Sequence, residues 1–437
     1  MARVSLEQVP FGAFHGRLAV YANGGLFCDG YILSSFGLAL ASLQTQIAVS
    51  ASMEGALAAA PLAGIFLGGL IFGYVTDLVG RRFMFIGDLI AFVLASLLLG
   101  VAQTPAEIFV LRFVLGVAIG ADYTIAAALI GEFTPQRSRG AALASMQVAW
   151  FVGALAAFVV GALLQAVGPD AWRWILASSA VPAAVALLLR RTVPESPRWL
   201  MSKGRSAEAL AAVHQALGPQ ATTDDIDPAV APTRLGQLFE DRYGGLVVFA
   251  GVMWLLQVTP FFAIYTFEPQ VLDALRLSSA ASVVSAVVIT GFFLIGSIIG
   301  MRLVETWGRR LLAISSFGAS AVAFAILALV HGTLPIALAF IFYALAMGPA
   351  FSLELVYPAE LFPTEVRATA AGFVTAISRI GAAAGTLLLP LGLAVYGASW
   401  VMWVACGLSI IGYTLSWLWA PETKGLTLAQ SSALGRR

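Results

Sequence analysis

Among the ionisable side chains within long apolar segments of this sequence, four are expected near mid-depth or facing a probable cavity: Asp29, Asp122, Glu354 and Arg379. Burying such a group in a membrane span costs several kcal/mol, so each is a candidate for function. A guanidinium offers a fixed fork of donors that suits a carboxylate, and it keeps its charge. We therefore predict that Arg379 binds the carboxylate of a small organic anion. A structural partnership of Arg379 with Glu354 or Asp29 is the alternative.

Asp29 and Asp122 are the candidates for proton coupling. A carboxyl group that is removed from water holds its proton at a higher pH than an exposed one, and nearby charges shift that pH again. Such a group can load a proton on one side of a membrane and release it on the other. The alternative hypothesis is that both acids are neutral and only fix the packing of helices.

Aromatic side chains in the same segments suit a pocket for a planar or partly apolar acid, although packing is the commoner role of a buried ring. The predicted substrate-binding residues are Arg379, Tyr31, Tyr123, Trp150, Gln257, Phe261, Tyr265 and Glu354. Phe262 is a further candidate for this pocket. Two other acids receive different roles: Glu268 is expected to be solvated at the end of its span, and Asp88 to be a partner for the basic cluster that contains Arg82.

The composition places these residues in a lipid bilayer. Of 437 residues, 60% are hydrophobic and 11% charged, whereas about a quarter of a soluble domain is charged. Apolar runs of about 20 residues recur, and lipid requires such spans to be helical. The twelve predicted spans are 18–42, 53–76, 84–103, 107–131, 140–166, 173–190, 244–267, 280–303, 311–331, 334–357, 368–394 and 398–419.

The positive charges orient these spans. All but four of the 24 Lys and Arg residues lie on the side that carries both termini. The positive-inside rule makes that side cytoplasmic. Residues 1–17 lack the apolar core of a cleaved signal peptide, so we expect the first span to remain as an anchor. The excess of Arg over Lys and the short outer loops favour a bacterial inner membrane.

A repeat divides the chain into two halves. Gly80 recurs 228 residues later as Gly308, and acidic and basic residues around it recur at the same offset. The repeated pairs are Asp77 with Glu305, Arg81 with Arg309, Arg82 with Arg310, Glu132 with Glu360, and Arg139 with Arg367. Related halves in a membrane chain predict a site between them that opens to either side. We predict bundles of six helices over 1–190 and 244–437, joined by a cytoplasmic linker over 191–243 with short helices at 197–217 and 234–242.

The repeated motifs resemble signatures of the major facilitator superfamily. Residues 73–82 resemble its loop 2–3 signature, and 194–200, 357–367 and 421–425 resemble segments of its sugar-porter branch. The resemblance implies an all-α fold of 12 transmembrane helices in two pseudo-symmetric bundles. It also implies that the repeated charges form ion-pair networks that close and open the cytoplasmic face; these predicted gating residues are Asp77, Arg81, Arg82, Glu132, Arg139, Glu305, Arg309, Arg310, Glu360 and Arg367.

Shorter segments refine the resemblance. Residues 29–31 and 120–123 are similar to bacterial metabolite:proton symporters, and to phosphate and aromatic-acid symporters. Residues 378–381 resemble span 11 of organic-ion transporters, where anion carriers place an arginine. Two departures matter: Leu78 replaces a basic residue of the signature, and Gln257 stands alone where sugar porters carry a Gln pair. The missing pair argues against hexose as the cargo.

The leading hypothesis is a secondary active transporter that moves a small organic anion, such as an aromatic or sugar acid, with protons. The alternatives are a sugar or polyol porter, a proton-driven exporter of drugs or metabolites, and a membrane sensor on a transporter scaffold. The sequence has no phosphate loop, metal-spaced His and Cys set or Ser–His–acid arrangement, so we expect no enzyme, cofactor or ATP-driven pump. Its net charge of +1 gives no reason to expect nucleic acid. We expect a monomer whose partners are a small substrate, protons and lipid.

Overall fold

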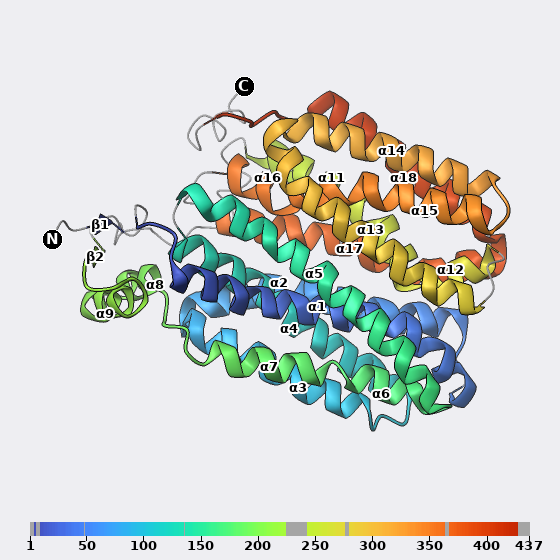
Figure 1. Cartoon of the computed structure of the whole chain (residues 1–437), viewed down its shortest axis with the longest axis horizontal. Helices are drawn as coiled ribbons and strands as arrows, with labels where there is room; N and C mark the ends of the chain where they lie inside the picture. Colours follow the sequence, from blue (N-terminus) through green and yellow to red (C-terminus); the bar gives the residue numbers. More distant parts are fainter. Residues whose placement is uncertain are drawn as a thin grey trace.

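The computed structural model describes residues 4–5, 9–47, 49–134, 136–223, 243–275, 279–362 and 367–426. Among these residues, twelve helical segments are long and apolar enough to cross a membrane. This confirms the predicted number of spans and the all-α class. The spans run side by side along the long axis of the molecule, and the two halves of the chain form its two sides (Figure 1).

Each half contributes six of these spans. The N-terminal half consists of α1 (Ala13–Gln46), α2 (Ala51–Val79), α3 (Arg81–Leu99), α4 (Pro105–Phe133), α5 (Gln136–Leu164), the 3₁₀ turn η1 (Gln165–Val167), α6 (Ala171–Ala177) and α7 (Ala180–Arg190). The C-terminal half consists of α11 (Gly244–Thr266), α12 (Glu268–Ala274), α13 (Ser279–Thr306), α14 (Arg309–Leu329), α15 (Thr333–Met347), the 3₁₀ turn η2 (Gly348–Ser352), α16 (Leu353–Leu361), α17 (Arg367–Tyr396) and α18 (Ala398–Trp419).

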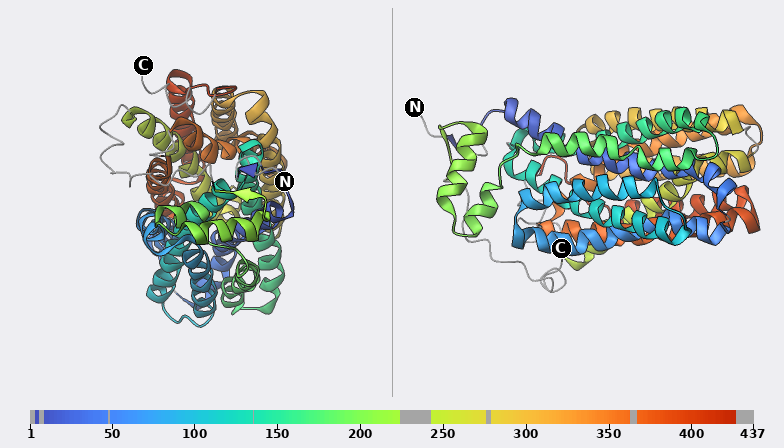
Figure 2. Two further views of the ribbon diagram at one scale, coloured as in Figure 1. Left: turned by 90° about the vertical axis from the view of Figure 1, so that its left-hand side faces the viewer. Right: turned by 90° about the horizontal axis from the view of Figure 1, so that it is seen from below.

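The described part of the linker lies at one end of the bundle, together with the first and last residues that the structure describes (Figure 1). Its helices α8 (Pro197–Ser202) and α9 (Ser206–Leu217) fall within the stretch predicted to be helical. Strand β1 (Val4–Ser5) pairs in parallel with β2 (Ala221–Thr222) beside them. We call this the linker end and the opposite one the far end (Figures 1 and 2). The predicted helix at 234–242 lies outside the described residues, and the division of the chain into domains stays a prediction.

Two predicted spans are interrupted. The sixth span consists of α6 and α7, with Ser178 and Ser179 between them. The tenth consists of α15 and α16, joined by η2. Pro349 lies in η2 and cannot donate a backbone hydrogen bond, which accounts for a break at this point. Broken helices at this depth are a feature of transporter binding sites, because they free backbone groups beside a cavity.

Close helix packing in the N-terminal half depends on glycines that recur every four residues. A Cβ atom at Gly64 of α2 would lie 2.3 Å from the carbonyl oxygen of Phe113 in α4. A Cβ atom at Gly116 of α4 would lie 2.0 Å from the carbonyl oxygen of Pro61. No other residue permits such an approach, and in lipid this kind of contact is a main source of helix association.

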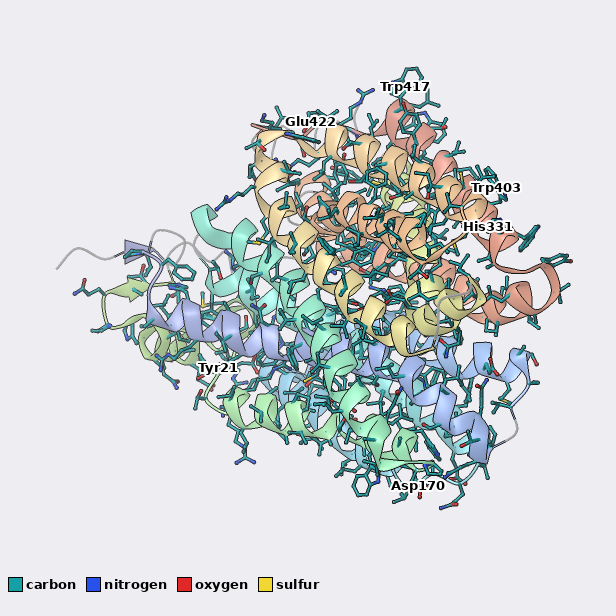
Figure 3. The ribbon with its side chains drawn as sticks, turned by 45° about the vertical axis from the view of Figure 1, so that its right-hand side comes forward. Tyr21, Asp170, His331, Trp403, Trp417 and Glu422 are labelled. Atoms are coloured by element: carbon teal, nitrogen blue, oxygen red, sulfur yellow. The ribbon has the colours of Figure 1, made fainter. Side chains whose placement is uncertain are left out.

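The outer surface of the bundle is apolar. Large hydrophobic side chains project from the faces of α3, α7, α13 and α18 that point away from the bundle. Trp403 and Trp417 of α18 show this arrangement clearly (Figure 3). An exposed apolar surface of this extent would be unstable in water, so it marks the faces that contact lipid acyl chains.

Candidate functional site

Arg379 of α17 lies at the junction of the two halves. Its side chain is 2% exposed. The guanidinium carbon lies 5.5 Å from the centre of the Tyr123 ring in α4, 5.4 Å from that of Phe262 and 5.6 Å from that of Trp254, both in α11. Rings at these distances stabilise a cation through their π faces. The two halves together therefore enclose this side chain.

Arg379 keeps hydrogen-bonding capacity in this enclosure. No carboxylate of the described residues lies within ion-pair distance of its guanidinium, and its Nε atom is buried without a hydrogen-bond partner among them. Glu354 of α16 is close enough to act on Arg379 electrostatically. Its Oε1 atom accepts a hydrogen bond of 3.2 Å from Nε2 of Gln257 instead. A buried cation with open donors is suited to an incoming anion.

Asp122 is held by a second arginine, Arg190 at the end of α7. Nη1 of Arg190 lies 2.6 Å from Oδ1 of Asp122 and 3.3 Å from Oδ2 of Asp88 in α3. The same guanidinium donates to the carbonyl oxygens of Tyr21 and Phe85, and it stacks on the Phe85 ring at 3.6 Å. All three charged side chains are completely buried. We call Arg190, Asp88 and Asp122 the charge triad.

The charge triad corrects one prediction and qualifies another. The predicted pairing of Asp88 with the basic cluster that contains Arg82 is wrong, because the long Arg190 side chain extends back into the bundle and pairs with Asp88. Asp122 is predicted, like Asp29, to be an acid that couples protons, yet it forms a buried ion pair. The assignment of Asp122 to proton coupling stays a prediction.

Asp29 of α1 is in a different environment. Its side chain is completely buried, and neither carboxylate oxygen has a hydrogen-bond partner among the described residues. It lies within electrostatic range of Asp122, Arg190 and Arg379. An unpaired ionised carboxylate is costly away from water. Asp29 is therefore a buried acid that interacts electrostatically with both the charge triad and Arg379.

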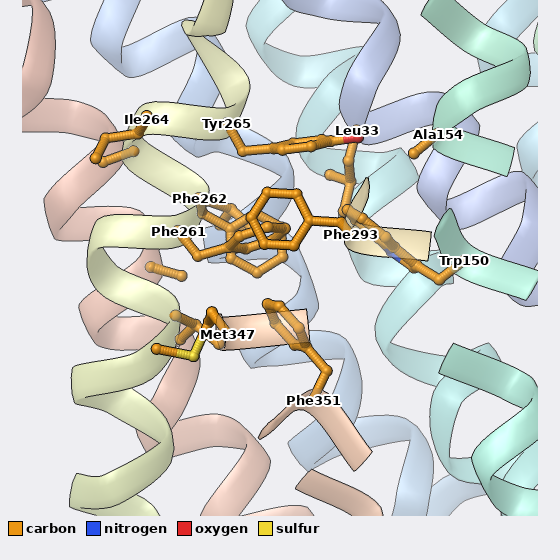
Figure 4. Close-up of a cluster of buried hydrophobic side chains, with 14 of the residues drawn as sticks. Leu33, Trp150, Ala154, Phe261, Phe262, Ile264, Tyr265, Phe293, Met347 and Phe351 are labelled. Carbon is orange, nitrogen blue, oxygen red and sulfur yellow. The ribbon is translucent and has the colours of Figure 1, made fainter. Parts of the chain in front are cut away.

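Aromatic rings fill the space between the halves beside Arg379. Trp150 of α5 lies 6.0 Å from Phe261 and 5.8 Å from Tyr265, both in α11. The Phe293 ring of α13 completes this cluster (Figure 4). Tyr31 takes part in a different contact, because its hydroxyl lies 2.8 Å from that of Ser178 at the break between α6 and α7. The predicted aromatic residues thus divide between the junction and the N-terminal half.

The prediction that Glu268 is solvated is wrong. Its side chain is only 2% exposed, because α12 folds back against α13 and packs the first residue inward. The sequence places Glu268 directly after an apolar span and gives no sign of this turn of the chain.

At the linker end, the repeated charges bring Arg309 together with two acids of its own half. Its Nη2 atom lies 3.0 Å from Oε1 of Glu305 and 2.6 Å from Oε1 of Glu360. The backbone amides of Arg309 and Arg310 donate to Glu422 at 3.0 and 3.1 Å. The side chains of Asp77, Glu132, Arg139 and Arg367 lie outside the described part of the chain.

Glu195 repeats the role of Glu422 in the N-terminal half. It accepts from the backbone amides of Arg81 and Arg82 at 3.0 and 3.1 Å. Each acid thus satisfies free amides at the start of a helix, α3 or α14, where the helix dipole also favours a negative charge. No role was predicted for either acid. The signal that could have found them is their recurrence at nearly the offset of the other repeats.

Comparison with known proteins gives matches over nearly the whole chain. Residues 25–434 match the family described as sugar (and other) transporter. The putative metabolite transport protein YaaU of Escherichia coli (strain K12) is 39% identical over 431 residues, which cover 98% of this chain and 97% of that protein. The inner membrane metabolite transport protein YgcS of the same organism is 34% identical over 433 residues, which cover 99% and 97%.

Solved structures show the same fold. The proton:xylose symporter XylE of E. coli, bound to 6-bromo-6-deoxy-D-glucose, is similar with a TM-score of 0.82 at 22% identity. The similarity covers 97% of this chain and 99% of that one. XylE belongs to the major facilitator superfamily, and the match confirms the predicted arrangement of two six-helix bundles.

Proposed function

The chain belongs to the sugar (and other) transporter family of the major facilitator superfamily, and we propose that it carries a small organic anion together with protons by alternating access. Its relatives are transport proteins, so it is a membrane transporter of metabolites and not an enzyme. The proposal concerns the cargo and the driving ion, and one observation carries it: a buried guanidinium with open donors between the two halves.

Arg379 supports an anionic cargo. A cation that is 2% exposed and has no carboxylate within ion-pair distance among the described residues gains strongly from a bound anion. The surrounding rings of Tyr123, Trp254 and Phe262 favour a planar or partly apolar body attached to the carboxylate. Because these rings come from both halves, a cargo bound there would contact both and would be sensitive to their relative motion.

Asp29 supports the coupling to protons. Ionised Asp29 would repel an anion near Arg379, since it lies within electrostatic range of that guanidinium. Protonated Asp29 removes the repulsion, so cargo and proton would favour each other's binding. Release of the proton on the other side would then expel the anion. Asp122, the other acid predicted to couple protons, differs from Asp29 in that its carboxylate is bound in an ion pair with Arg190.

We place the linker end in the cytoplasm. That end carries nearly all of the Lys and Arg residues that flank the spans, which the positive-inside rule assigns to the inner side. The far end then faces outward, and the location is the inner membrane of a bacterium, as for YgcS. A monomer contains the whole site, because both halves that enclose Arg379 belong to one chain.

A sugar cargo is the main competing proposal, since XylE is a xylose symporter. Hexose recognition requires several free hydrogen-bonding side chains. In this protein the single Gln257 of α11 already donates to Glu354. At the junction, the Arg379 guanidinium has free hydrogen-bond donors and is surrounded by aromatic rings. This environment suits a carboxylate better than the hydroxyl groups of a sugar.

The test begins with a thermal-shift screen of purified protein against small carboxylates, aromatic acids, sugars and amines. Ligands that raise the melting temperature are then used for uptake into proteoliposomes with an imposed pH gradient. Arg379→Ala should weaken binding of a carboxylate about 30- to 4,000-fold, the equivalent of about 2–5 kcal/mol for truncating one partner of a buried charge pair. Arg379→Lys should recover little, since an ammonium cannot form the two-pronged contact.

Asp29→Asn should abolish accumulation against a gradient while exchange of cargo across the membrane continues. Arg205→Ala, a change to an exposed arginine of the linker, is the matched control and should have no effect on either. Stabilisation by sugars alone, or full transport by Arg379→Ala, would refute the anionic cargo. Undiminished accumulation by Asp29→Asn would refute the assignment of the proton.

A further inference from the structure

A second unpaired acid, Glu268, lies on the far-end side of the aromatic cluster described above and shares Phe261, Tyr265 and Phe293 with it. It is the first residue of α12 at the far end, directly after the chain leaves the helical conformation at Phe267 (φ −107°, ψ 26°). Its side chain is 2% exposed, and neither carboxylate oxygen has a hydrogen-bond partner among the described residues. An ionised carboxylate in this position would be left without compensation for its lost hydration.

The walls around Glu268 are apolar and come from three helices of the C-terminal half. Together with Glu268 the lining residues are Phe261, Ile264 and Tyr265 of α11, Ile289 and Phe293 of α13, and Phe340 and Tyr343 of α15. The hydroxyl of Tyr265 lies 3.1 Å from that of Thr290. The hydroxyl of Tyr343 is buried without a partner among the described residues. We call this space the Glu268 chamber.

Two phenols are the titratable groups that face Glu268 from the helices packed against it. These are Tyr265 of α11 and Tyr343 of α15; the residues that α13 contributes to the lining are uncharged. Residues 32–46 of α1, which α12 approaches, include no titratable side chain. On α12 itself, the side chain of Asp273 lies outside the described part. No cation among the lining residues is available to stabilise an ionised Glu268.

The size of the chamber decides what can bind there. The space open to the centre of a water molecule is about 10 Å³, which leaves room for at most about one water. An organic molecule does not fit. A metal ion would need several ligands, and no group of three or more His, Cys, Asp or Glu side chains suited to a metal occurs among the described residues. With organic molecules and metal ions excluded, a proton is the ligand that the Glu268 carboxylate can bind in this chamber.

The same short helix also holds the two halves together at the far end. Two residues after Glu268, Nε2 of Gln270 donates a hydrogen bond of 3.1 Å to the carbonyl oxygen of Gly37 in α1. Opening the far end requires this contact between α12 and α1 to break. Because Glu268 lies two residues before Gln270 on the same short helix, a movement of α12 that broke this contact would also shift Glu268 relative to its chamber.

We propose that Glu268 is a second proton-binding site, which holds a proton while the far end is closed and releases it when α12 moves to open that end. The site goes beyond the proposed function, because it acts without cargo and does not involve Arg379 or Asp29. Burial raises the pKa of the Glu268 carboxyl well above its ordinary value. The closed state is therefore favoured at low pH and loses that advantage as the pH rises.

Infrared spectroscopy of the full chain in lipid nanodiscs, without cargo, tests the site directly. The carbonyl stretch of a protonated carboxylic acid should be present at neutral pH and should disappear as the pH rises. Glu268→Gln should lose this component. The matched control is Glu107→Gln, the same change at an exposed acid of the far end; it should keep the component. Asp29→Asn should keep the part of the band that Glu268→Gln removes, although it loses any part that Asp29 contributes, which separates this proposal from the assignment of the transported proton.

A distance measurement tests the link to opening. Spin labels at Gln103→Cys and His331→Cys, exposed positions at the far ends of the two halves, report their separation, while the native Cys28 and Cys406 are buried. The separation should increase with pH in the otherwise native protein, and Glu268→Gln should lose this shift and remain closed. Tyr343→Phe keeps the acid but removes a neighbouring hydroxyl, so it should shift the infrared titration without abolishing it.

Each outcome of these two experiments either supports or overturns the proposal. Loss of both the infrared component and the pH-dependent separation in Glu268→Gln supports the proposal. An infrared spectrum that is identical in Glu268→Gln and the native chain overturns it, as does a pH-dependent separation that persists in that variant. Should Glu268→Gln fail to fold, the native spectrum and its response to Tyr343→Phe decide, and the absence of any response overturns the site.

Discussion

Replacing Arg190 by methionine should destabilise the N-terminal half strongly. Arg190 is completely buried, and the carboxylates of Asp88 and Asp122 lie 3.3 and 2.6 Å from its Nη1 atom. Removing Arg190 leaves both carboxylates buried without a cationic partner. Breaking a buried pair in this way costs about 3–5 kcal/mol. On the scale that holds for a domain of about 190 residues, this lowers the melting temperature by about 6–20 °C.

The assay is thermal unfolding of the purified variants in one detergent. Arg205→Ala is the control, because it removes an arginine from a pair with Glu208 that is exposed to water and should cost less than about 1 kcal/mol. Combining Arg190→Met with Asp88→Asn and Asp122→Asn should restore most of the stability, since no buried charge is then left without a partner. A melting temperature of Arg190→Met equal to that of Arg205→Ala would show that the charge triad is not the buried network described here.

Two further predictions concern the ends of the bundle. Gly55→Ala should greatly reduce transport measured in proteoliposomes, because its Cβ atom would lie 2.2 Å from the carbonyl oxygen of Leu387 in the other half; Gly16→Ala, with open space around it, should transport normally. Uptake at the native rate by Gly55→Ala would contradict this contact. Glu422→Ala should lower the unfolding free energy by about 1–2 kcal/mol through the loss of two amide partners at the start of α14; an unchanged denaturation midpoint would rule this out.

The membrane fold could be predicted from local properties of the sequence. The length and apolar character of a segment determine where helices cross lipid, so the number of spans was found without any knowledge of their neighbours. The interruption at Pro349 was missed because a span is recognised from the apolar character of its whole length, which a single missing amide donor does not change.

The candidate site was predictable only in part. The presence of Asp29, Asp122, Glu354 and Arg379 within the spans could be seen directly, since a charge in an apolar run is conspicuous. The partners of these four side chains could not be predicted, because pairing depends on which faces of the helices lie against each other. Arg190 illustrates this limit: it ends a span next to another arginine and resembles an ordinary cytoplasmic flank, yet its side chain extends back to Asp122.

The sequence by itself determined a duplicated, twelve-span membrane protein with charges placed inside its spans, because insertion into lipid depends on the composition of each segment alone. The tertiary structure decided which of those charges are satisfied. It paired Asp122 with Arg190, left Asp29 and Glu268 unpaired, and surrounded Arg379 with rings from both halves. The physical reason is that the state of a buried charge depends on neighbours a few ångströms away, which come from helices distant in the chain.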